Sequence, residues 1–431
     1  MNAAAPSDPR AGRRGRFAWC LYDWANSAFP TVIETFVFAT FFARAVARDP
    51  ETGTAQWGLA LGLAGGAVAL ISPALGAVAD RAGARKPWLA AFTAMIALSS
   101  FCLWFTKPMP DYALWALVWF GLGTMAFEFA QVFYNAMLPD LAPKDRIGRL
   151  SGWGWGMGYA GGLFCLAVSL VVLVQAQPPP FGLDTAQQEP VRATALLVAL
   201  WVAVFSVPLL LWTPDRPRTG APLGRAVREG VAELLRTLRT LPRERVIGRF
   251  LLARMLYIDG LNTIFAFGGI YAAGSFGMGF EEILLFGIAL NVTAGLGAAG
   301  FGWLDDRLGP KPVIVASLAA LLIIGAALLV VESKTWFWTL GIALGAFFGP
   351  VQSASRSLMT RLAPPERAAE LFGLYAFSGK ATAFLGPLAL AWATTIWESQ
   401  RAGMATTLAF ILAGLALMLA VPVNAGSGGR R

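Results

Sequence analysis

Twelve apolar runs divide this chain, and each is long enough to cross the hydrocarbon core of a bilayer as a helix of about 20 residues. The runs cover residues 17–46, 55–79, 87–106, 111–138, 151–175, 193–212, 246–273, 282–304, 312–331, 335–360, 369–394 and 402–423. Hydrophobic residues make up 57% of the chain and charged residues only 14%. The sequence therefore predicts an all-α membrane protein with twelve transmembrane helices.

The basic residues are distributed unevenly between the two ends of these spans. With the N-terminus placed inside, the inner segments hold 25 of the 34 lysines and arginines and the outer segments hold six. This asymmetry follows the positive-inside rule and predicts that both termini are cytoplasmic. The net charge of +9 is then a property of membrane topology, and no nucleic-acid partner is expected. Histidine is absent and the three cysteines form no metal pattern, so no metal or cofactor is expected.

The two halves of the chain repeat one another. GAVADRAGARK at 76–86 matches GWLDDRLGPK at 302–311, and LAPKDRIGRLSG at 141–152 matches LAPPERAAELFG at 362–373. The repeat predicts two pseudo-symmetric bundles of six helices, over 17–212 and 246–423. The segment 213–245 between them is rich in arginine and is either an amphipathic helix on the inner membrane surface or a solvated linker. Residues 1–16 and 424–431 are expected to be cytoplasmic tails.

The first of these repeats resembles the signature loop of the major facilitator superfamily. YDWANSAF at 22–29, the stretch 138–162 and YIDGLNTIF at 257–265 resemble its vacuole-effluxer-like branch. The resemblance implies alternating-access transport and a latch at the inner gate. The expected gate residues are Gly76, Asp80, Arg81, Gly83, Arg85, Asp306, Arg307 and Arg146. Fungal members of the branch are described as vacuolar amino-acid exporters.

Polar residues inside the spans are candidates for the transport site, because an ionisable group in the membrane needs a partner or a cavity. At 100° per residue, one helical stripe joins Asp23, Asn26, Pro30 and Glu34. The candidates for substrate or proton binding are Asp23, Asn26, Glu34, Glu128, Gln131, Asn135, Asp259, Asn262, Gln352 and Lys380. For Asp23 and Asn26, helix packing remains an alternative, and a structural pair with one acid remains an alternative for Lys380.

In the superfamily that the chain resembles, the first, fourth, seventh and tenth spans line the cavity. Acids fall here on the first, fourth and seventh spans and cations on the tenth and eleventh, which favours a zwitterionic solute such as an amino acid. A coupling proton is expected on Glu34, Glu128 or Asp23, because burial favours the neutral carboxyl group. The predicted protein is a monomeric secondary transporter of the bacterial inner membrane, and not an enzyme. Two alternatives remain: a receptor or scaffold that kept the transporter fold, and an exporter of a different small molecule.

Overall fold

The computed structural model describes residues 12–220, 222–241 and 244–422, which form helices and connecting segments without any strand. The expected tail residues 1–11 and 424–431 lie outside this part of the chain. The first six spans are α1 (Arg13–Asn26) with its continuations η1 (Phe29–Phe36), α2 (Phe38–Phe41) and η2 (Phe42–Val46), then α3 (Pro50–Ala82), α4 (Lys86–Leu103), α5 (Ala113–Leu141), α6 (Ile147–Val168) with η5 (Ser169–Val174), and α7 (Glu189–Trp212).

The other six spans follow α8 (Leu223–Thr240). They are α9 (Arg245–Phe276), α10 (Phe280–Leu308), α11 (Pro310–Val330), α12 (Lys334–Leu362), the pair α13 (Ala368–Lys380) and α14 (Leu385–Trp397), and α15 (Gln400–Leu419). Single turns of 3-10 helix, η3 (Pro110–Tyr112), η4 (Lys144–Arg146), η6 (Pro180–Gly182) and η7 (Pro365–Arg367), lie in the connections. In the described part of the chain, ten spans are long and apolar enough to cross a membrane. The polar α12 and the α13–α14 pair bring the number to twelve.

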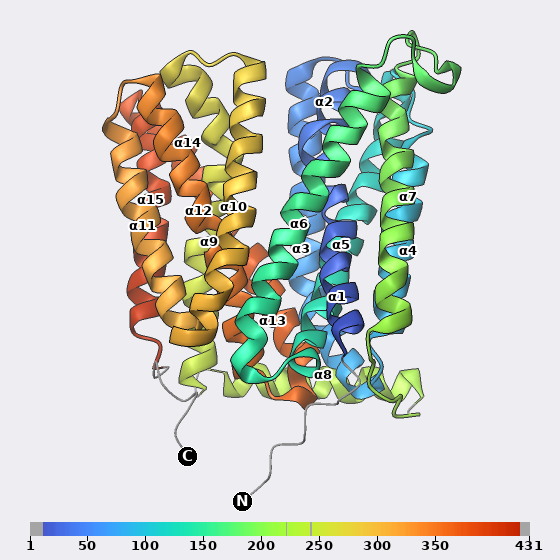
Figure 1. Ribbon diagram of the computed structural model, residues 1–431, viewed down its shortest axis with the longest axis vertical. Coiled ribbons are helices and arrows are strands. Elements are labelled where there is room, and N and C mark those ends of the chain that lie inside the picture. Colours follow the sequence, from blue (N-terminus) through green and yellow to red (C-terminus); the bar gives the residue numbers. More distant parts are fainter. Residues whose placement is uncertain (1–11, 221, 242–243, 423–431) are drawn as a thin grey trace, which may run out of the picture.

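The twelve spans form two bundles that stand side by side (Figure 1). One bundle holds α1 to α7 and the other holds α9 to α15, as the internal repeat predicts. The bundles meet where α3 packs on α13 and α6 packs on α10. Helix α8 lies across one end of both bundles, which we call the α8 end, and the bundles diverge toward the opposite end (Figure 1).

The first span does not remain α-helical. Its middle, η1, and its last turn, η2, are π-helical, and the amide of Val37 donates to the carbonyl of Val32 at 3.0 Å. A π-helix turns through fewer degrees per residue because its hydrogen bonds close five residues apart. The 100° spacing used for the stripe from Asp23 to Glu34 therefore does not hold through η1, which begins at Phe29. Glu34 nevertheless lies in the interior of the protein, where its charge interacts with Lys380 of the other bundle.

The eleventh span is broken where the sequence predicts one continuous helix over 369–394. Helix α13 ends at Lys380, α14 begins at Leu385, and the amide of Leu385 closes a turn onto the carbonyl of Thr382 at 2.8 Å. Pro387 explains the break, because a proline ring excludes the carbonyl four residues earlier from a continuous helix. Each half-helix has 13 residues, so Lys380 lies at an internal helix end.

Helix α8 is amphipathic, and one side of its apolar face is used within the protein. Its Gly230 lies so close to α3 that a Cβ atom there would be 2.8 Å from the backbone nitrogen of Val78. Ala226 and Leu234 are buried on this side. The adjacent stripe is exposed and consists of Val227, Val231, Leu235 and Leu238.

Candidate functional site

Two aspartates from the repeated loops each cap a helix of the other bundle. Asp80, near the end of α3, accepts hydrogen bonds from the amides of Ala369 (3.1 Å) and Glu370 (2.8 Å) in the first turn of α13. Asp306, near the end of α10, accepts one from the amide of Gly148 at 2.8 Å in the first turn of α6. The two caps are related by the sequence repeat. Each places a carboxylate against the positive end of a helix macrodipole.

Glycines of the repeated motif allow this arrangement. Gly83 ends α3 with a φ of 87°, and its equivalent Gly309 ends α10 with a φ of 89°. Glycine adopts this conformation without the strain that a side chain would cause. Gly76 lies against α13, and a Cβ atom on it would be 2.1 Å from the carbonyl oxygen of Ala369. The backbones of the two bundles are therefore in direct contact at the α8 end.

Arg85 joins several segments at this end. Its guanidinium group lies 2.8 Å from the carboxylate of Asp140 and 3.6 Å from that of Asp80, and it donates to the carbonyl of Pro365 in the other bundle at 3.3 Å. Arg81 pairs with Glu233 of α8 at 3.0 Å.

The other two expected gate arginines are less engaged. Arg146 is exposed, and the ion pair described for it is with the adjacent Asp145 at 3.8 Å. Arg307 is also exposed. Arg149, which the sequence did not single out, pairs with Asp306 at 2.6 Å.

A buried ion pair connects the bundles deeper in the protein. Arg356 of α12 lies 3.1 Å from the Asp23 carboxylate of α1, and their side chains are 2% and 6% exposed. The guanidinium group also donates to Asn135 Oδ1 (3.2 Å), to Ser151 Oγ (2.9 Å) and to the Ser151 carbonyl (2.6 Å). Tyr134 donates its hydroxyl to Asp23 at 2.8 Å. This network satisfies both charges, which burial requires.

Aromatic rings surround this ion pair. Trp19 stacks on Tyr134 with the ring centroids 4.3 Å apart, and its indole nitrogen donates to the Tyr134 carbonyl at 3.0 Å. The Arg356 guanidinium group lies 5.0 Å from the Trp19 ring and 5.5 Å from the Trp155 ring, in the range of cation–π attraction. Gln131 reaches Asp23 at 3.5 Å.

A second charged cluster lies near mid-depth and is accessible. Lys380, at the end of α13, pairs with Glu128 of α5 at 2.6 Å, and these side chains are 26% and 19% exposed. The charge of Glu34 interacts with both of them. We call Glu34, Glu128 and Lys380 the central triad. It contains two acids and one base and joins helices of both bundles.

Space between the bundles also remains beside η1, although no member of the triad lines it. A cavity of about 360 Å³ is lined from the first bundle by Thr35 and Phe36, which follow Glu34, and from the second bundle by Phe265 and Phe286. The bonds between the bundles described above lie at the α8 end and at mid-depth. The structure is therefore closed at the α8 end.

The remaining candidates for substrate or proton binding differ in burial and in whether they contact the other bundle. Asp259 is buried within the second bundle, and Gly386 of α14 packs so closely that a Cβ atom there would lie 3.1 Å from its Oδ1. Asn262 is exposed, whereas its counterpart Asn26 is buried. Gln352 donates to the hydroxyl of Tyr159 across the bundles at 3.3 Å. The mirrored pairs in α1 and α9 are thus not equivalent: Asp23 contacts the other bundle and Asp259 packs inside its own.

Sequence reasoning missed several members of the buried network. Tyr134, Ser151 and Trp19 carry no sequence signal that separates them from ordinary packing residues. Among the described residues no group of three or more acids, cysteines or histidines is arranged to hold a metal ion.

Comparisons with known proteins match this geometry to a family. The model of the family described as "Vacuole effluxer Atg22 like" matches residues 59–429. The chain belongs to this family. An uncharacterised transporter of the major facilitator type, YxiO of Bacillus subtilis, is 27% identical over 410 residues, which are 94% of either chain. Autophagy-related protein 22-1 of Penicillium rubens is 25% identical over 307 residues, covering 64% of this chain and 50% of that protein.

The fold agrees with the family. The solved structure of the proton:xylose symporter XylE superimposes with a TM-score of 0.73 over 95% of both chains, at 14% identity. The Atg22-like chain is thus an integral membrane transporter of the major facilitator superfamily, as the loop at 76–86 predicts. Its relatives are transporters and not enzymes. It spans only half the length of the Penicillium relative.

Proposed function

We propose that this protein is a proton-coupled secondary transporter that moves a small zwitterionic solute, with amino acids as the leading class. The observation that carries the proposal is the central triad. Its Glu128–Lys380 pair spans the two bundles at mid-depth and is partly exposed, whereas the Asp23–Arg356 pair is sealed. Paired charges inside a membrane protein that remain accessible are typical of a substrate pathway.

The triad has the chemistry to bind a zwitterion by exchanging partners. In the structure Lys380 and Glu128 neutralise one another at 2.6 Å. An amino acid offers a carboxylate to Lys380 and an ammonium group to Glu128 or Glu34, so that each charge of the site keeps an opposite partner. The exchange avoids leaving a lone charge in the membrane interior, which would cost several kcal/mol. Glu34 and Glu128 also supply carboxyl groups that can carry the coupling proton.

The bonds between the bundles at the α8 end and beneath it are the contacts that must break for the protein to open on that side. The caps by Asp80 and Asp306 and the Asp23–Arg356 pair all join the two bundles. We propose that they break when the bundles rock about the central triad and open the α8 end. A solute shifts this equilibrium only through different contacts in the two states, and the partner exchange of Lys380 provides that difference.

The positive-inside distribution supports a cytoplasmic α8 end and both termini on that side. We further propose residence in a bacterial inner membrane, function as a monomer, and division of the chain into bundles 17–212 and 246–423 joined by 213–245. The family description as an effluxer supports export as the direction of transport.

Two measurements test this function. A thermal-shift screen of the purified protein against the twenty amino acids should reveal a subset that raises Tm, and no shift with any of them would contradict the amino-acid class. Uptake into proteoliposomes under an imposed pH gradient should then fail for both Glu34→Gln and Glu128→Gln. Glu332→Gln, which removes an exposed acid, is the matched control and should retain uptake. If both Glu34→Gln and Glu128→Gln retain gradient-driven uptake, neither glutamate carries the coupling proton.

A further inference from the structure

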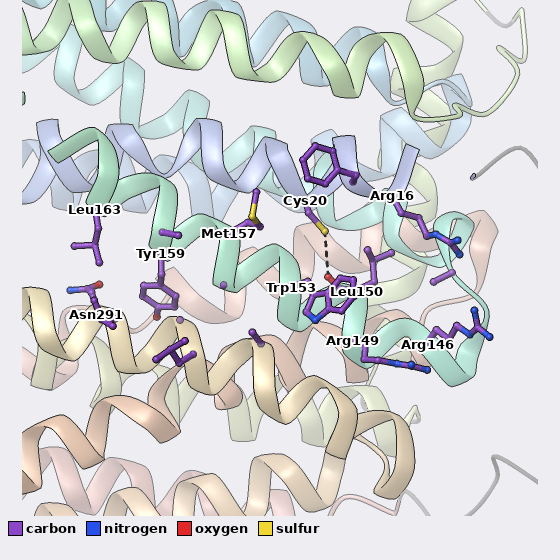
Figure 2. A pocket seen from close by; sticks show the side chains of 18 of the residues that line it. Arg16, Cys20, Arg146, Arg149, Leu150, Trp153, Met157, Tyr159, Leu163 and Asn291 are labelled. Carbon is purple, nitrogen blue, oxygen red and sulfur yellow. Dashed lines mark hydrogen bonds between the residues drawn. The ribbon is translucent and has the colours of Figure 1, made fainter. Parts of the chain in front are cut away.

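A surface groove at the α8 end is separate from the central triad. It has a volume of about 770 Å³ and runs between α1, α6 and α10 (Figure 2). Its lining is largely apolar and includes Phe17, Trp153, Met157, Ala160 and Leu296. Phe17 is 57% exposed and Leu296 69% exposed, so the groove opens on the outer surface of the bundles.

Cations gather at one end of the groove. Arg16, Arg146 and Arg149 lie together there, whereas Tyr159, Leu163 and Asn291 lie toward the other end (Figure 2). Arg13 also lines the groove. The apolar part therefore ends in a cluster of four arginines on the side of the membrane where α8 lies.

The charge of this cluster is only partly balanced. Arg149 pairs with Asp306. Arg146 lies 3.8 Å from Asp145, and the side chains of Arg146 and Asp145 are both more than half exposed. Within the described residues, no acid pairs with Arg13 or Arg16. The basic end therefore keeps an excess of about two positive charges for a ligand to neutralise.

We propose that the groove binds one anionic phospholipid of the cytoplasmic leaflet, with its phosphate among the arginines and an acyl chain along α6 and α10. The length supports this occupant. From Arg149 to Leu163 the helix rises about 21 Å at 1.5 Å per residue, which exceeds half of the roughly 30 Å hydrocarbon thickness. Basic pockets between membrane helices on the cytoplasmic side suit anionic head groups. A zwitterionic lipid such as phosphatidylcholine has a cation beside its phosphate, so it would neutralise none of the net charge of the cluster.

The test is native mass spectrometry of the full chain in detergent, titrated separately with phosphatidylglycerol and with phosphatidylcholine. The wild type should retain one phosphatidylglycerol and bind phosphatidylcholine much more weakly. Arg13→Gln with Arg16→Gln should weaken phosphatidylglycerol binding by about 30-fold, the effect of two arginines near the membrane surface. Arg228→Gln with Arg245→Gln removes the same charge from exposed positions outside the groove and should change binding little. Equal binding of both lipids, or equal loss in both double variants, would overturn the proposal.

A second variant tests the apolar part independently of charge. Ala160 is exposed in the groove, so Ala160→Trp fills it without touching the arginines. This variant should lose the retained phosphatidylglycerol while its Tm in detergent alone stays unchanged. Photo-crosslinking with a phosphatidylglycerol that carries a diazirine on its acyl chain should label wild-type peptides from α6 and α10 and spare Ala160→Trp. Labelling that is unchanged in Ala160→Trp would refute the assignment. Solute transport is not the readout, so failure here leaves the proposed function untouched.

Discussion

Asp23→Asn is the substitution that tests most directly how a buried charge pair holds the two bundles together. It removes the charge opposite Arg356 but keeps the size of the side chain. The two groups lie 3.1 Å apart and are almost fully buried, and they belong to different bundles. Removing one partner of a buried pair costs about 3–5 kcal/mol, and we take the lower figure because Asn135 and Ser151 still accept from the guanidinium group.

This cost falls on the state that is closed at the α8 end, because opening separates the bundles and lets water reach Arg356. A loss of about 3 kcal/mol shifts the equilibrium between the two states toward the open one by roughly 100-fold. A closed population of 99% would therefore fall to about one half.

Spin labels at Lys144 and Leu308, both exposed at the α8 end of opposite bundles, measure the shift by double electron–electron resonance. The buried native cysteines are replaced first. Asp23→Asn should add a population at longer distance. Asp259→Asn is the matched control, because its carboxylate packs within one bundle, and it should leave the distances unchanged. An unchanged distribution in Asp23→Asn, or the same shift in both variants, would refute the role of this ion pair.

Three further outcomes are expected. Asp306→Asn should shift the same distances less than Asp23→Asn does. The new amide oxygen still accepts from the amide of Gly148, the side chain of Arg149 is 35% exposed and remains solvated, and the cap at Asp80 stays intact. A larger shift would contradict this order. Gly76→Val should trap the protein open at the α8 end, because even the valine Cβ would lie 2.1 Å from the carbonyl oxygen of Ala369 in α13. Crosslinking of the two bundles across that end in the variant would refute the prediction. Gly386→Ala should lower Tm by several degrees, because the alanine Cβ would lie 2.1 Å from Thr263 Oγ1. An unchanged Tm would contradict this prediction and show that α14 moves to accommodate the methyl group.

The overall fold was predictable because its signals are local or repeated. Span lengths, the charge asymmetry and the match between 76–86 and 302–311 each require only short windows of sequence. The match also predicts that Asp80 and Asp306 have equivalent environments, and the structure gives both the same kind of helix cap. The sequence could not say which helix each one caps, because Asp80 and Glu370 are 290 residues apart.

The candidate site was less predictable, for three physical reasons. Arg356 lies near a helix end, where a long side chain can reach either the membrane surface or a buried partner, and only tertiary packing decides between them. From Phe29 onward η1 is π-helical, so a helical wheel drawn at 100° per residue does not give the angle between Asp23 and Glu34. The break at Lys380 depends on Pro387, which acts on the carbonyl of Ala383 four residues earlier, inside an otherwise continuous apolar run.

Counterflow in proteoliposomes tests whether the central triad is the solute site. Vesicles loaded with an unlabelled amino acid that stabilises the protein should accumulate the labelled form with wild-type protein. They should fail to do so with Glu128→Gln and with Lys380→Met, while Asp259→Asn still exchanges. Loss of exchange in both triad variants, with their folding intact, is the predicted result. Full exchange by Lys380→Met would contradict the assignment of Lys380 as the partner of the solute carboxylate, and with it the zwitterion site.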